Sequence, residues 1–101
     1  MGELHDWLTR QHPGLRTYKV FQQKALQLAS AEPEHRACYR MLAALADGYI
    51  DSFDEEPLPV EVAQQAFERL LGVVSDAEQS IQAPPADQLA TLNKIAAATL
   101  L

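Results

Sequence analysis

Residues 33–81, PEHRACYRMLAALADGYIDSFDEEPLPVEVAQQAFERLLGVVSDAEQSI, decide the fold. Apolar side chains recur at steps of three and four on both sides of the break DEEPLP at 54–59, which is the spacing of one helix face. Pro33 and Pro59 each suit the first turn of a helix, because the N–H that proline lacks would be unpaired there anyway. We therefore predict two long helices, one from Pro33 until the chain turns polar at 51–56, the other from Pro59 to about Ile81. A short connection makes such helices antiparallel neighbours.

The apolar residues of these two helices can be paired by counting outward from the break. We expect the seam of the core to hold the pairs Phe53 with Val60, Tyr49 with Ala63, Leu45 with Phe67, Leu42 with Leu70 and Cys38 with Val74. Gly72 lies inside the second helix, which we expect to be continuous.

Three further helices are expected around this hairpin. A short amphipathic helix at 3–11 presents Leu4, Trp7 and Leu8 on one side, and a longer one spans about 15–29. A last helix starts near Pro85, runs to the end of the chain and is expected to bury Leu89, Leu92, Ile95, Ala96 and Thr99. Residues 1–101 are thus expected to form a single all-α domain, an antiparallel four-helix bundle-like structure with a short extra N-terminal helix.

The charge is unevenly distributed along the chain. The net charge is −6; residues 1–50 carry six Lys and Arg against five acids, which gives +1, whereas residues 51–101 carry two against nine, which gives −7. This balance argues against a nucleic-acid binder. Two interpretations of the acidic half stay open: neutralisation within the fold, with Arg36 and Arg40 near Asp76 and Glu78, or an acidic face that meets a basic partner.

Two places are candidates for binding a protein partner. The first is the tip of the predicted hairpin, with an acidic rim around an apolar centre, made by Tyr49, Phe53, Asp54, Glu55 and Glu56; the alternative is a solvated, charged helix end. The second is Trp7, because tryptophan is over-represented at interface hot spots. Its alternative role is to pack on the bundle as a lid.

The sequence contains only incomplete metal-binding motifs. His35 and Cys38 are three residues apart and could share a soft metal, but a structural zinc site wants four such ligands. The segment Glu32-Pro33-Glu34-His35 has the Glu-x-x-His spacing of di-metal helical sites without the second copy that those sites use. We expect no metal and no cofactor, and keep His35 and Cys38 as the candidates.

No motif in the sequence names a reaction. A glycine-rich phosphate loop and a nucleophile motif are both missing, so we expect no enzyme. Our leading hypothesis is a non-catalytic interaction module, such as a small regulator, adaptor or chaperone-like protein, which forms a homodimer or binds a basic protein. The alternatives are a small ligand- or metal-binding carrier and an acidic, antitoxin-type neutraliser of a basic partner. One cysteine, no signal peptide and no membrane-length apolar run favour a cytoplasmic location without membrane contact.

Overall fold

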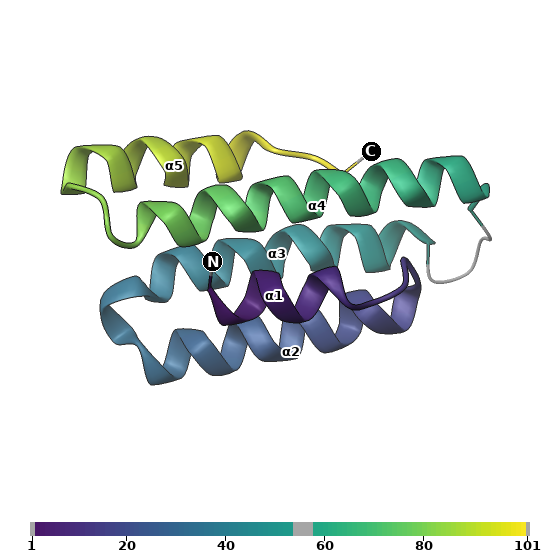
Figure 1. Cartoon of the computed structure of the whole chain (residues 1–101), viewed down its shortest axis with the longest axis horizontal. Coiled ribbons are helices and arrows are strands. Elements are labelled where there is room, and N and C mark those ends of the chain that lie inside the picture. Colours follow the sequence, from purple (N-terminus) through teal and green to yellow (C-terminus); the bar gives the residue numbers. More distant parts are fainter. Residues whose placement is uncertain (1, 54–57, 101) are drawn as a thin grey trace.

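The computed structural model describes residues 2–53 and 58–100, and within these ranges the chain is all-α, with five helices packed together and no strand. The predicted all-α class is confirmed. Along the chain the elements are α1 (Glu3–Thr9), α2 (Leu15–Ala31), a 3-10 turn η1 (Pro33–His35), α3 (Arg36–Phe53), α4 (Val60–Ser80) and α5 (Pro85–Ala97) (Figure 1).

Prolines mark where the helices begin, as expected. Pro59 caps α4 and Pro85 is the first residue of α5. At Pro33 the chain first makes the 3-10 turn, so that α3 begins three residues later than predicted. At the other end, α5 stops at Ala97, Ala98 is extended, and Leu100 returns to the core. The expectation that this helix reaches the chain end is therefore wrong.

The closest pairing of helices is between α2 and α3, which approach one another far more extensively than any other pair. Both helices bury alanines, Ala25 and Ala29 on α2 and Ala43 and Ala46 on α3. Small side chains let helix axes come close, because interaxial distance depends on the residues at the contact. The tightest unit of the fold is therefore α2 with α3, and not the predicted pair of α3 with α4.

The expected seam between α3 and α4 is looser than predicted. Their Cα atoms hardly approach within 8 Å, although buried residues of both helices belong to one core. Leu42 of α3 and Phe67 of α4 are among these buried residues. Val60 is 83 % exposed, so its expected pairing with Phe53 in the core is wrong. The other pairs remain predictions.

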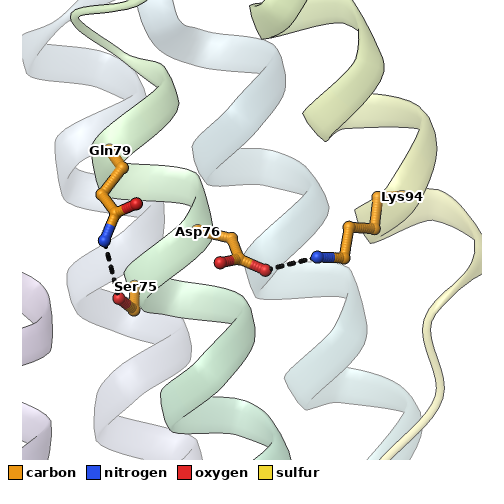
Figure 2. A network of polar contacts seen from close by, with 4 residues as sticks. All are labelled: Ser75, Asp76, Gln79 and Lys94. Atoms are coloured by element: carbon orange, nitrogen blue, oxygen red, sulfur yellow. Dashed lines mark hydrogen bonds and ion pairs between the residues drawn. The ribbon is translucent and has the colours of Figure 1, made fainter.

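A polar network links α4 to α5 (Figure 2). Lys94 Nζ on α5 lies 2.7 Å from Asp76 Oδ2 on α4, and Gln79 Nε2 donates to Ser75 Oγ at 3.4 Å. Arg36 instead donates from Nε to the Ala29 carbonyl oxygen. Asp76 is thus paired within the fold by Lys94 of α5, and the expected approach of Arg36 and Arg40 to Asp76 and Glu78 remains a prediction.

The buried stripe of α5 is also narrower than expected. Ile95 is buried and Leu92 half-buried, whereas Leu89 is 60 % exposed and Ala96 and Thr99 are exposed. The predicted burial of Leu89, Ala96 and Thr99 is therefore wrong. Only one edge of α5, and not a broad face, packs against α3 and α4. None of the described helices has the length and apolar character needed to cross a membrane.

Candidate functional site

The structure describes only part of the predicted site at the hairpin tip. The side chain of Phe53 and residues Asp54, Glu55 and Glu56 lie outside the described residues. Tyr49 is only 6 % exposed, and its ring stacks on Tyr18 of α2. Tyr49 is therefore a core residue, in contrast to the partner-facing position that the sequence analysis expected.

Trp7 lies at the edge of the core, where the packed helices meet the surface. It is half-buried, next to the fully buried Leu4 and Leu8 of the same short helix. Lys24 of α2 places its Nζ 5.1 Å from the centroid of the Trp7 ring, a cation–π distance. The tryptophan thus packs on the fold while one part of its ring remains accessible, and both predicted roles stay open.

The short helix α1 is held in place by a carboxylate from the far end of the sequence. Glu78 of α4 accepts the backbone N–H of Leu4 at 3.2 Å and that of His5 at 3.1 Å. Burial raises the pKa of the Glu78 carboxyl, and the two N–H donors act against that rise. The Glu78 carboxylate also lies so close to Gly2 that a Cβ added there would displace it. Glu78 is therefore engaged in structure.

The metal candidates separate into two groups. Cys38 is buried, and burial raises the pKa of its thiol, which disfavours the thiolate that binds metals. His35 and Cys38 line the same small cavity of about 50 Å³. A different combination gathers three ligands: one ligand atom each of Glu32, Glu34 and His35 lies within 4.8 Å of the other two. The pattern at 32–35 is thus a better metal candidate than the pair His35 and Cys38.

An apolar groove of about 410 Å³ lies between α3 and α5. Its lining residues are Met41, Ala44, Leu45, Gly48, Ile95, Ala96, Ala98 and Thr99. Ala44 and Gly48 are exposed, Met41 and Leu45 are half-buried, and Ile95 is buried below them. A Cβ placed on Gly48 would meet no atom within 4 Å, which agrees with open space above this part of α3. The groove therefore offers apolar surface to an incoming side chain.

One wall of this groove is made by the segment after α5. Arg69 Nη1 on α4 donates to the Leu100 carbonyl oxygen at 3.3 Å, and the Leu100 side chain is buried. This anchor keeps Ala98 and Thr99 beside α3. On α3, Asp51 is exposed and follows Gly48 by one turn, so a carboxylate continues the line of the groove toward the end of the helix.

Sequence reasoning missed the groove, although its signal is present in α3. Met41, Ala44, Leu45 and Gly48 are spaced three or four residues apart on one face of the helix, but Leu45 was assigned to the core seam and Ala44 and Gly48 were not considered. The role of Glu78 had no such signal, because it contacts residues more than seventy positions earlier in the chain. Searches of protein-family models, of curated proteins and of solved structures found no match to this chain.

Proposed function

We propose that this chain is a non-catalytic helical interaction module that binds an amphipathic, basic helical segment of another protein in the groove between α3 and α5. The observation on which the proposal depends is the groove itself, an apolar hollow of about 410 Å³ between two helices. An amphipathic helix that lays its apolar face into a groove is a recurrent mode of peptide recognition.

The chemistry of the lining supports a helical partner. Ala44 and Gly48 leave room for the side chains of an incoming helix, while Met41 offers a flexible, polarisable surface that adapts to different shapes. Leu45 and Ile95 form the apolar floor. These residues can exclude water from the apolar side chains of a partner, but they offer no group for acid–base or nucleophilic chemistry.

Charge supports a basic partner. The second half of the chain carries two cations against nine acids, and Asp51 is exposed at the α3 end of the groove. Opposite charges at the rim of an interface raise the association rate and fix orientation. A second copy of this chain, with its net charge of −6, lacks that complementarity. We therefore favour a basic partner over the expected homodimer.

The proposal includes the finer architecture that the sequence predicted. In it, α2, α3, α4 and α5 act as an antiparallel four-helix bundle-like frame, and α1 is the short extra helix fastened to that frame by Glu78. The groove is then a gap that the frame leaves open between α3 and α5. The tight contact of α2 with α3 supports this role, because it fixes one wall of the groove.

Site-directed photo-crosslinking in the native host tests the proposal. A photoreactive amino acid replaces Ala44 in the groove, and in a matched variant it replaces Ala90, an exposed residue of α5 outside the groove lining. We expect one dominant adduct from position 44 and none of that adduct from position 90. Mass spectrometry should place the crosslink in a segment with helical apolar spacing and an excess of Lys and Arg. An acidic segment, or the same adducts from both positions, would refute the proposal.

A second candidate function rests on the cluster of Glu32, Glu34 and His35. One imidazole and two carboxylates match the ligand types of a zinc site that keeps an open coordination position. The test is a Zn²⁺ titration by calorimetry of protein purified without a polyhistidine tag. His35→Asn should abolish stoichiometric binding, whereas His12→Asn at an exposed histidine outside the cluster should not. Equal zinc binding by both variants would eliminate this carrier function.

A further inference from the structure

A second cleft, of about 290 Å³, opens between α1 and α2, separate from the groove between α3 and α5. Its lining residues are Glu3, Leu4, Trp7, Arg10, Lys24, Gln27, Leu28 and Ala31. Glu3, Leu4 and Trp7 of α1 and its C-cap residue Arg10 follow one another at steps of one, three and three. The α2 members follow at steps of three, one and three, so each segment contributes one face. Figure 1 shows α1 lying alongside the lower helices, with α2 among them.

The cleft combines an apolar interior with an aromatic wall. Leu4 is buried at its base, and Leu28 and Trp7 are half-buried along its sides. Small-molecule sites are typically of this kind, mostly apolar with a few polar groups that fix orientation. Their volumes run from roughly 300 to 1,000 Å³, so a cleft of about 290 Å³ suits a small ligand.

The charges at the cleft are opposite to those of the protein as a whole. Arg10 and Lys24 line it together with one acid, Glu3, whereas the complete chain has fourteen acids against eight Lys and Arg. Lys24 is positioned over the Trp7 ring, with its Nζ 5.1 Å from the ring centroid. A cation is therefore held beside the aromatic wall, where it can meet an anion whose apolar part enters the cleft.

We propose that the cleft between α1 and α2 binds a small monocarboxylate with an apolar body. The carboxylate pairs with Lys24 and Arg10, and the apolar body lies against Trp7, Leu4 and Leu28. Glu3 limits the ligand to a single negative charge, because a second one would be repelled. This site is independent of the proposed partner groove, with which it shares no lining residue.

Trp7 makes the proposal measurable, since it is the one tryptophan of the chain. The full chain is titrated with decanoate, with 2-naphthoate and with the neutral 2-naphthamide, and binding is followed by tryptophan fluorescence and by calorimetry. We expect saturable one-to-one binding of a carboxylate and much weaker binding of the amide. Decanoate and naphthoate share the required chemistry, and their relative affinities distinguish an aliphatic from an aromatic body.

Matched double variants provide the control. Arg10→Gln with Lys24→Gln removes both cations of the cleft and should weaken carboxylate binding by about tenfold to a hundredfold, the range for a lost charge-assisted hydrogen bond. Arg16→Gln with Arg40→Gln removes the same charge from exposed positions of α2 and α3 and should leave binding unchanged. Circular dichroism verifies that both variants are folded.

Four results would overturn the proposal: no saturable binding of either carboxylate up to ~1 mM, equal affinity for the amide, equal loss in both double variants, or no loss in either. Binding to the partner groove is unaffected by all four, so failure here leaves the proposed function standing.

Discussion

The rings of Tyr18 on α2 and Tyr49 on α3 stack with their centroids 3.9 Å apart and their planes 16° from parallel. Both side chains are buried, and burial raises the pKa of each phenol. The stack joins the two helices that approach one another most closely. It explains why Tyr49, which the sequence places near the acidic hairpin tip, belongs to the core and not to a partner surface.

Removal of the Tyr49 ring should destabilise the fold strongly. Tyr49→Ala deletes a buried aromatic side chain and leaves a cavity, a change that costs about 3–5 kcal/mol for aromatic residues. Tyr49→Phe keeps the ring and its stack, so it should cost at most about 1.5 kcal/mol, the range for one hydrogen bond. Urea unfolding followed by circular dichroism measures both. A Tyr49→Ala variant as stable as the wild type would contradict the core position of this ring.

Gly72→Ala should stabilise the protein. Gly72 lies inside the continuous helix α4, and a Cβ there would meet no atom within 4 Å. Alanine favours a helix interior over glycine by about 1 kcal/mol, and nothing in the surroundings opposes that gain. The free energy of unfolding should therefore rise by roughly 0.5–1 kcal/mol. A loss of stability would mean that another group packs against α4 at this position.

Much of the fold was predictable because its signals are local. Proline positions and the three-and-four spacing of apolar residues gave all five helices, with ends displaced by a few residues. The preference of α3 for α2 over α4 is not a local property. It depends on contacts between side chains of different helices, such as the stack of Tyr18 on Tyr49. Counting outward from the break at 54–59 could pair only the two helices that adjoin it in the sequence.

The candidate sites were less predictable than the fold for the same reason. The sequence analysis singled out Trp7, yet nothing local indicates that Lys24 covers its ring. Likewise, the acidic character of 51–101 was visible, but not that Glu78 is used to hold Leu4 and His5. Sequence spacing shows which residues share a helix face, whereas a cleft between two helices requires the packing itself.

Glu78 should contribute less to the stability of the fold as pH rises. Burial raises the pKa of Glu78 above its ordinary value of 4.5, so the native state binds more protons than the unfolded chain between these two pKa values. The contribution of this group to the free energy of unfolding therefore falls as pH rises through that interval. Glu78→Gln does not titrate and retains an acceptor for one N–H of α1.

Urea unfolding of the wild type and of Glu78→Gln across this interval isolates the effect. Because the two proteins differ only at position 78, the pH dependence of the difference in their stabilities should report the ionisation of Glu78 together with its effect on neighbouring charges. As pH rises, the free energy of unfolding of the wild type should fall relative to that of Glu78→Gln. A shift in favour of the wild type would show that the two N–H donors outweigh burial.

Cys38 should react slowly with thiol reagents in the native state. Its side chain is 7 % exposed, and burial raises its pKa, so the reactive thiolate is both scarce and covered. The native protein should be modified by 5,5′-dithiobis(2-nitrobenzoate) far more slowly than the urea-unfolded chain when all other conditions of the assay are the same. A native rate equal to the unfolded one would place the thiol at the surface.

The groove between α3 and α5 is tested most directly by calorimetry with the segment that crosslinks to position 44, using two glycine variants. Gly48→Leu and Gly72→Leu make the same change inside a helix, and a Cβ meets open space at both positions, but only Gly48 lines the groove. We predict that Gly48→Leu weakens binding by about tenfold or more, as expected for about 1.4 kcal/mol of lost contact, while Gly72→Leu binds like the wild type. Equal affinities for both variants would contradict the proposal that this groove holds the partner.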